Sequence, residues 1–257
     1  MGFRERIKLK RKKRKKETHV KSIKSSNDIL GIPHKKVFDD DKINFYLCPA
    51  SDSRRHVSYK NNKVNIIDFT YEKCSFMTWS KRNGKHHWLP SEAVRFGKRI
   101  AMDLGLDFDI NKCKCLNLNA DGKMIKYYVP DDGEFEYHQY NGIVTTGDSS
   151  ILYGNPNRAT KTEYHYLNDT HCISTIVNKS INGPSLLVIG DSMAVPIVLA
   201  FASVCSKITY IDNRHQYDIS MYNLHDYDKV FAIMVNNVGW SVNKFVCKTL
   251  DYFVNQI

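Results

Sequence analysis

The sequence predicts an α/β fold, a three-layer sandwich around a central and mainly parallel β-sheet. Three apolar segments of the last third, Leu186–Ile189, Ile208–Ile211 and Lys229–Val235, are typical of strands, with helical patterns between and after them. Alternating strands and helices favour parallel pairing, because each crossover connection packs a helix on a face of the sheet. The continuous apolar run at Leu186–Ile189 indicates a strand that is buried on both faces.

Two further strands and a helix are predicted earlier in the chain. Ile43–Leu47 and Val64–Phe69 are short, rich in β-branched or aromatic residues, and flanked by turn-forming residues. A helix is expected to begin at Pro90, with Ser91 available to cap its first turn and Gly105 suited to end it.

The middle of the chain is predicted to be a loop-rich insertion. Residues 107–180 are rich in Asn, Asp, Tyr and Gly, and only the surroundings of Lys126–Val129 and Gly142–Thr145 indicate strands. Beyond this insertion, Met193–Cys205 is expected to form an apolar helix. The final helix is indicated by apolar residues at helical spacing, namely Val242, Phe245, Val246, Leu250, Phe253 and Val254.

Positive charge is concentrated at the N-terminus. Residues 1–24 contain twelve Lys or Arg against Glu5 and Glu17, and so carry almost the whole net charge of +11. We expect residues 1–30 to be a disordered basic tail and linker, and residues 31–257 to be one domain. The tail could bind an anionic membrane surface, and nucleic acid is a less expected partner. Neither a signal peptide nor a membrane-spanning segment is recognised, which predicts a cytoplasmic protein, in contact with a membrane surface if the tail binds one.

The cysteine pattern does not indicate a disulfide framework or a zinc site. The seven cysteines are odd in number and scattered, and Cys113 and Cys115 form the only tight pair, without a second pair at a suitable spacing. Neither a metal nor an organic cofactor is expected.

Polar residues follow each of the three strands of the last third. They are Gly190–Ser192, Asp212–His215 and Asn236–Asn237. In open parallel sheets, ligands bind beyond the carboxyl ends of the strands. The three groups are therefore predicted to form one site.

Ser192 is the candidate nucleophile of this site. It lies where a buried strand turns into a helix, Gly190 permits a tight turn there, and the helix N-terminus favours developing negative charge. Asp191 could instead serve as a structural helix cap. A second Gly-Asp-Ser string, Gly147–Ser149, precedes no apolar helix. A serine hydroxyl needs a base, usually a histidine, and two candidates stand out: the string Lys85–Trp88, which contains His86 and His87, and the string Asp212–His215, an Asp-x-x-His at the end of the next strand.

Several segments together resemble the alginate O-acetyltransferase-like branch of the SGNH hydrolases, also named for an Asp-His-His-Trp motif. The similar segments are Gly84–Ala93, which contains Lys-His-His-Trp, and Val188–Ser192, which ends in Gly-Asp-Ser. Tyr210–Arg214, with its Asp-x-Arg, and Tyr227–Val230 also fit the pattern of that branch. The resemblance covers residues 40–257, more loosely in the middle. It implies an SGNH or flavodoxin-like fold and acyl transfer on carbohydrate, in relatives that work outside the cytoplasm behind a membrane anchor.

The resemblance implies that Ser192 is the nucleophile and His87 the base, in preference to His215. The acid of the triad would fall at Lys85, where a cation replaces the expected carboxylate. The acid could come from elsewhere in the fold, Ser192 and His87 could act as a dyad, or the site could be inactive, because a nearby lysine lowers the pKa of a histidine.

The sequence therefore predicts a serine-dependent O-acetylesterase or O-acetyltransferase that acts on the O-acyl groups of a carbohydrate or acylated sugar. The Ser192 amide, within the Gly190–Ser192 turn, would stabilise the oxyanion with Asn236 or Asn237. The alternative is an inactive protein of the same fold that binds glycan or a partner in polysaccharide assembly.

Overall fold

The computed structural model describes residues 42–49, 59, 61–70, 72–77, 87–120, 123–153, 173–212, 218–235 and 242–257. Contacts divide the chain into two units, Met1–Val37 and Phe38–Ile257. The first unit lies wholly outside the described residues. The basic tail at 1–30 and the single domain at 31–257 therefore stay predictions.

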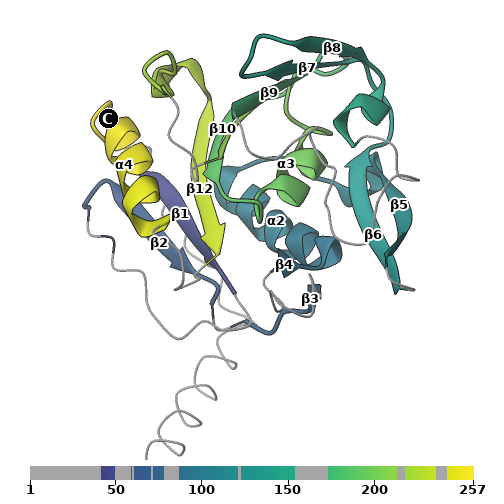
Figure 1. Cartoon of the computed structure of the whole chain (residues 1–257), viewed down its shortest axis with the longest axis horizontal. Helices are drawn as coiled ribbons and strands as arrows, with labels where there is room; N and C mark the ends of the chain where they lie inside the picture. Colours follow the sequence, from purple (N-terminus) through teal and green to yellow (C-terminus); the bar gives the residue numbers. More distant parts are fainter. Residues whose placement is uncertain are drawn as a thin grey trace, which may run out of the picture. The chain divides into compact units, whose positions relative to one another are not determined.

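One large sheet with few helices dominates the described part, which makes it a mixed α/β fold (Figure 1). The strand order in this sheet is β2-β1-β12-β10-β11-β9-β7-β8. The strands are β1 (Ile43–Cys48), β2 (Val64–Asp68), β7 (Phe135–Gln139), β8 (Val144–Gly147), β9 (Ile173–Asn178), β10 (Ser185–Gly190), β11 (Lys207–Asp212) and β12 (Lys229–Val235).

The sheet has a parallel half and an antiparallel half. Strands β2, β1, β12, β10 and β11 lie side by side in this order and pair in parallel. Strands β9, β7 and β8 then extend the sheet by antiparallel pairing. In the described residues, the parallel pairing predicted for the last third is thus present, and the middle of the chain adds the antiparallel half.

The middle of the chain contains more strand than predicted. Besides β7, β8 and β9, it forms a separate hairpin of β5 (Cys113–Ala120) and β6 (Lys123–Pro130), which packs against helices through Tyr127 and Val129. The strands expected near Lys126–Val129 and Gly142–Thr145 correspond to β6 and, in part, to β8, but the described part of 107–180 contains too much strand for the expected loop-rich insertion. In β6 and β7, buried apolar residues (Tyr127 and Val129, Phe135 and Tyr137) alternate with more exposed ones, so that one face is buried while the average composition stays polar.

A long helix, α2 (Pro90–Leu104), follows the short antiparallel pair β3 (Phe76–Met77) and β4 (His87–Trp88). Its N-cap residue is Leu89, with Pro90 at the first helical position and without a side-chain cap, so the predicted capping role of Ser91 is wrong. Proline suits this position because its missing N–H would have no partner within the helix. Gly105 ends α2 in the left-handed conformation, as predicted, with φ 66°.

The helix after β10 is shorter than predicted. Helix α3 spans Val195–Phe201 rather than 193–205. A turn takes up the first residues of the expected helix, because the Asp191 side chain accepts a hydrogen bond from the Met193 amide. The last helix, α4 (Val242–Val254), lies where the apolar spacing predicted it.

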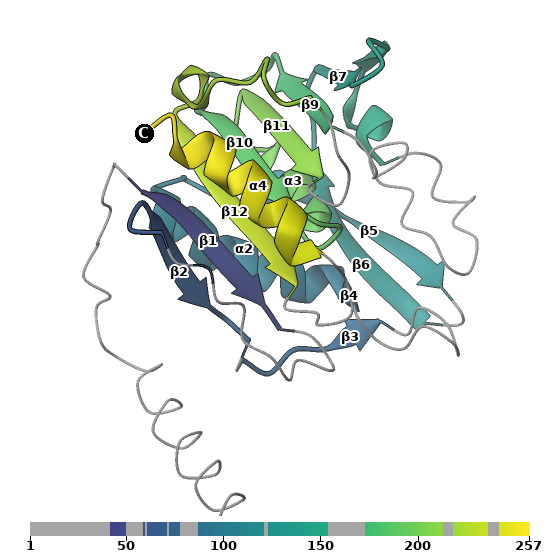
Figure 2. The same cartoon turned by 60° about the vertical axis from the view of Figure 1, so that its left-hand side comes forward.

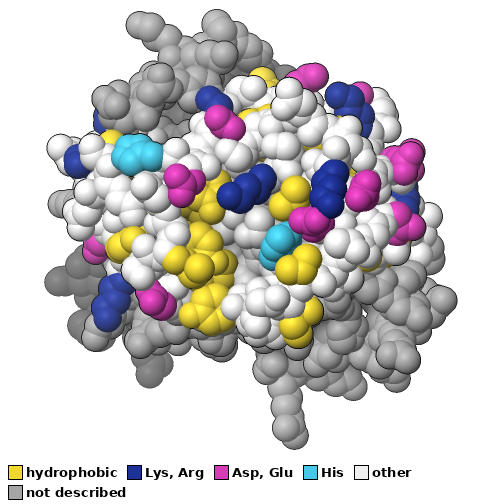
Figure 3. All heavy atoms as spheres, turned by 90° about the horizontal axis from the view of Figure 1, so that it is seen from above, with side chains coloured by type: hydrophobic (Ala, Val, Ile, Leu, Met, Phe, Trp, Pro, Cys, Tyr) yellow, Lys and Arg dark blue, Asp and Glu magenta, His cyan; other side chains and the backbone are white. Residues whose placement is uncertain are grey.

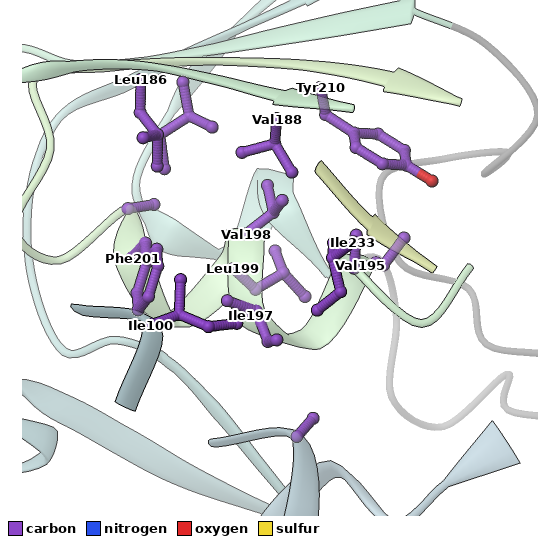
Figure 4. Packing of buried hydrophobic residues seen from close by; sticks show 14 of the residues in the cluster. Ile100, Leu186, Val188, Val195, Ile197, Val198, Leu199, Phe201, Tyr210 and Ile233 are labelled. Atoms are coloured by element: carbon purple, nitrogen blue, oxygen red, sulfur yellow. The ribbon is translucent and has the colours of Figure 1, made fainter. Parts of the chain in front are cut away.

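Apolar side chains fill both sides of the sheet. In β10, Leu186 and Val188 join the cluster that contains residues of α2 and α3, whereas Leu187 and Ile189 join the cluster that contains residues of α4. Figure 2 shows α4 in front of β12 and β10, with α2 and α3 behind them. Figure 4 shows the packing of α3 against the strands. The buried strand predicted from its apolar run is therefore covered on both faces.

Figures 1 and 3 show opposite ends of the parallel strands. Figure 1 shows β3 and β4 at the end toward which β12 runs. The opposite end, viewed in Figure 3, mixes apolar side chains with charges of both signs. None of the helices among the described residues is long and apolar enough to span a membrane.

Candidate functional site

The site is built at the carboxyl end of β10, where Gly190 is the last residue of the strand. Gly190 lies opposite Asp212 of β11 and Ile233 of β12. A Cβ atom at this position would come within 2.9 Å of the Ile233 carbonyl oxygen and within 2.7 Å of the Ala194 Cβ. Only glycine therefore lets the chain turn back this tightly between its two neighbours.

Residues 191–194 form a tight turn, with Ser192 as its second residue. The Asp191 carbonyl accepts from the Ala194 amide at 2.9 Å, and Asp191 Oδ1 accepts from the Met193 amide at 2.8 Å. Asp191 itself is buried, whereas Ser192 is half-buried. The turn thus keeps Ser192 out of the closed core, and the hydrogen bond to the Asp191 side chain fixes the backbone on either side of Ser192.

Two buried aromatic residues hold the carbonyl groups that flank Ser192. The Tyr210 hydroxyl donates to the Asp191 carbonyl at 2.9 Å, and the Trp88 indole Nε1 donates to the Met193 carbonyl at 3.2 Å. Tyr210 belongs to the cluster drawn in Figure 4, where its side chain extends from the strand layer. Donors from β11 and β4 therefore restrain the backbone on both sides of the candidate nucleophile.

The second of these bonds also brings the histidine motif to the turn. His87 and Trp88 form β4, which pairs with Met77 and Phe76 of β3. The Trp88 bond therefore joins the strand that contains His87 to the turn that contains Ser192. The His87 side chain and all of Lys85 lie outside the described residues.

Trp88 is itself fixed by an aromatic stack. Its ring stacks on Phe96 of α2, with centroids 4.9 Å apart and planes at 19°, and Phe96 stacks in turn on Phe69 at 5.2 Å. Trp88 is 1% exposed. Aromatic stacking and burial leave little freedom for the side chain that joins β4 to the turn.

A buried thiol lies close to the Asp191 carboxylate. Cys48 ends β1 and is fully buried. Burial raises the pKa of Cys48 well above its ordinary value, and the charge of Asp191 adds to this effect. Cys48 is therefore a neutral packing residue and a poor nucleophile.

The other sequence-predicted residues are placed unevenly. Asp212 ends β11 and is fully buried beside Gly190, at the predicted rim. His215, Asn236 and Asn237 lie outside the described residues, so their roles stay predictions. Among the described residues, His, Cys, Asp and Glu side chains do not gather in any group of three that could hold a metal ion.

The second Gly-Asp-Ser string has a structural role. Asp148 caps a short 3-10 helix over Ser149–Leu152, and its Oδ1 atom accepts from the Ser150 amide at 2.8 Å. Ser149 is buried. The same three residues thus form a plain cap when no buried parallel strand precedes them.

Sequence reasoning did not assign roles to Trp88, Tyr210 or Cys48. Trp88 belongs to the recognised motif, but its bond to Met193 spans too much of the sequence to be inferred from spacing. Tyr210 lies two residues after Ile208 in β11, which predicts that both side chains lie on the same face of the sheet. This spacing does not predict a bond from Tyr210 to Asp191. Nothing in the sequence distinguishes Cys48 from an ordinary core cysteine.

Comparison with solved structures shows that the fold is similar to that of a DHHW family protein. No family model and no curated protein matches the chain. A DHHW family protein from Eubacterium siraeum aligns with a TM-score of 0.57 and 15% identity, over 83% of this chain and 84% of that protein.

Bacillus cereus PatB1 gives a similar result. Its structure aligns with a TM-score of 0.57 and 18% identity, over 80% of this chain and 86% of that protein. A second PatB1 structure, which carries a sulfonyl adduct, aligns with a TM-score of 0.57 and 17% identity, over 79% and 84% of the two chains. At these identities the likeness establishes a shared fold.

Proposed function

We propose that this protein is a serine-dependent acyl-transfer enzyme that acts on O-acyl groups of a carbohydrate, either as an O-acetylesterase or as an O-acetyltransferase. The observation that carries the proposal is the hydrogen bond from Trp88 to Met193. It joins the strand that carries His87 to the turn that carries Ser192. In this proposal, a nucleophile and a base that are distant in sequence would meet at one end of the sheet.

In the proposed reaction, Ser192 Oγ attacks the acyl carbonyl while His87 accepts the hydroxyl proton. Collapse of the tetrahedral intermediate breaks the ester bond, and His87 returns the proton to the leaving alcohol, which leaves an acyl-serine. Water then releases the acyl group as an acid, or a sugar hydroxyl accepts it as a new ester. The Ser192 amide and Asn236 or Asn237 would stabilise the oxyanion.

The solved structures support the proposed fold and the proposed nucleophilic site. PatB1 holds a sulfonyl group, and a sulfonyl group is attached to a protein through a nucleophilic side chain. The apolar clusters on the two faces of the sheet fit the three-layer, flavodoxin-like sandwich that we propose for the domain.

The motif does not supply the acid of the proposed triad. Lys85 occupies the place of the carboxylate in the motif. Asp212 is a fully buried carboxylate at the same rim, on the strand next to Gly190. It could supply the missing charge, or Ser192 and His87 could act as a dyad. In one protease, loss of the orienting acid lowers the rate about 10⁴-fold.

The test is covalent labelling of the full chain by a fluorophosphonate, with release of p-nitrophenol from p-nitrophenyl acetate as the second readout. Ser192→Ala should abolish both. Ser149→Ala is the matched control, because Ser149 also follows Gly-Asp but is buried as the first residue of a 3-10 helix. Full activity in Ser192→Ala would refute the proposal.

A second candidate function is supported by Lys85. A cation at this position would remove the acceptor that orients the base and would lower the pKa of the imidazole. The protein would then bind glycan or a partner in polysaccharide assembly without catalysis. In that case wild-type protein should be inert toward the ester, and Lys85→Asp should create esterase activity. An active wild type that gains little from Lys85→Asp excludes this second function.

We further propose that residues 1–24 bind an anionic membrane surface, since they carry twelve basic residues. Binding to vesicles containing phosphatidylserine should weaken steeply with salt and disappear when residues 1–24 are removed. Equal binding to neutral vesicles would contradict this proposal.

A further inference from the structure

Arg95 on helix α2 is bonded to the segment that leads into β3. Its Nε atom donates to Glu92 Oε2 at 2.9 Å and its Nη1 atom to Glu72 Oε2 at 3.0 Å. Its Nη2 atom donates to the Lys73 carbonyl at 2.8 Å. All three nitrogens of the guanidinium group are therefore engaged, two of them with the segment before β3.

The same segment is bonded to Leu89, the residue that follows β4, and to α2. The Ser75 carbonyl accepts from the Leu89 amide at 2.9 Å, and Glu92 Oε1 accepts from the Ser75 amide at 3.3 Å. Two residues further on, Met77 pairs with His87. The position of β4 thus depends on a segment that Arg95 and Glu92 hold against the first turns of α2.

A second route leads from Arg95 to the site through Phe96. The guanidinium carbon of Arg95 lies 4.2 Å from the centroid of the Phe96 ring, and this ring stacks on Trp88. Arg99 reinforces the arrangement, because it pairs with Glu72 and lies 4.5 Å from the centroid of the Phe69 ring. Cations over aromatic faces are attracted by the ring electrons.

We propose that Arg95 is a positioning residue that fixes β4, and with it His87, relative to Ser192. The inference rests on the proposed function. Each ion pair is partly exposed, with 45% of the Arg95 side chain accessible, and single pairs of this kind contribute little to stability. Arg95 matters through geometry, because a planar fork with three bonds fixes both the distance and the direction of the segment that it holds.

The experiment compares Arg95→Ala and Arg95→Lys with wild type and with Lys98→Ala, an exposed residue of the same helix. The rate constant for fluorophosphonate labelling of Ser192 is measured from pH 5 to 9, and hydrogen exchange of the Leu89 amide is measured on the same full-length proteins. Misplacement of a base by a fraction of an ångström should slow labelling on the order of tenfold or more across this pH range. The Leu89 amide should also exchange faster in both variants.

Lysine keeps the charge but cannot make three bonds in one plane, so Arg95→Lys should not restore the rate. Wild-type rates in both Arg95 variants, full rescue by lysine, or unchanged Leu89 exchange would each overturn the positioning role. A wild-type protein that does not label at all would instead refute the proposed function. Lys98→Ala should match wild type in both measurements.

Discussion

The indole of Trp88 donates to the carbonyl oxygen of Met193 across 105 positions of the sequence. His87 precedes the donor and Ser192 precedes the acceptor, so one hydrogen bond ties the two halves of the candidate site together. The bond is buried, where the loss of a partner is costly. A tryptophan in the recognised motif therefore has a physical task, which is to dock the histidine strand on the serine turn.

Replacement of Trp88 by phenylalanine should weaken both the fold and the site. The change removes the N–H donor and leaves a small cavity beside Phe96, which should lower the free energy of unfolding by about 2–3 kcal/mol. Labelling of Ser192 should slow as well, because β4 loses its bond to the turn. Urea denaturation and fluorophosphonate kinetics measure the two effects. A variant as stable and as reactive as wild type would show that the bond has no such role.

Tyr210→Phe gives a narrower test, since it removes only the hydroxyl that donates to the Asp191 carbonyl. The expected loss of stability is about 1 kcal/mol, together with slower labelling of Ser192. Tyr227→Phe is the matched control, because its hydroxyl donates to Thr209 Oγ1 at 2.9 Å, on a residue adjacent to Tyr210 in β11. The control should lose similar stability and keep the wild-type labelling rate. Equal labelling rates in the two variants would contradict a role for Tyr210 in the turn.

The base is tested by a pair of histidine variants. General base catalysis typically contributes about 10²–10⁴-fold, so His87→Ala should slow labelling of Ser192 by this factor. His215→Ala should have little effect, because we propose His87 as the base. The reverse result would make His215, with Asp212, the base.

The last third of the fold could be predicted because its signals are local. Strand β12 begins and ends where the apolar run does, and β10 and β11 extend their predicted runs by one residue at each end. Buried parallel strands must be apolar on both faces, which makes them visible in the sequence. The same logic placed Gly190 and Asp212 at one rim, as their register confirms.

The middle of the chain and the contacts of the site could not be read from local patterns. In β7, Phe135 and Tyr137 are buried while their neighbours are polar, so the strand resembles a loop in composition. The shortening of α3 depends on a side-chain bond from Asp191, and the docking of Trp88 depends on tertiary packing. Such long-range relationships are decided by the whole fold.

Gly190 should be intolerant of substitution for a steric reason. Alanine at this position would place its Cβ against the backbone oxygen of Ile233 and against Ala194. We expect a loss of about 3 kcal/mol or failure to fold. Gly105→Ala is the comparison, because Gly105 has φ 66° and open space around its Cβ position. Only the left-handed conformation opposes alanine there, at a cost of about 1 kcal/mol, measured by urea denaturation. Equal losses would contradict the steric argument.

Alkaline pH should destabilise the protein through its buried thiols. Burial raises the pKa of Cys205 from an ordinary 9.0 to about 12. A group whose pKa is raised by folding stabilises the native state below its unfolded pKa and loses this effect as the pH rises toward the folded pKa. Between pH 9 and pH 12, the unfolded chain therefore gains a thiolate that the native state resists.

The size of this effect can be isolated with Cys205→Ala. One pKa unit corresponds to about 1.4 kcal/mol, so moving from pH 8 to pH 10.5 should cost wild type about 2 kcal/mol more than it costs the variant. The other described thiols with raised pKa values, Cys48, Cys74 and Cys113, are present in both proteins, and their contributions cancel in the comparison. Urea denaturation at the two pH values measures the difference. Parallel losses in the two proteins would show that the Cys205 thiol ionises as easily in the folded chain as in the unfolded one.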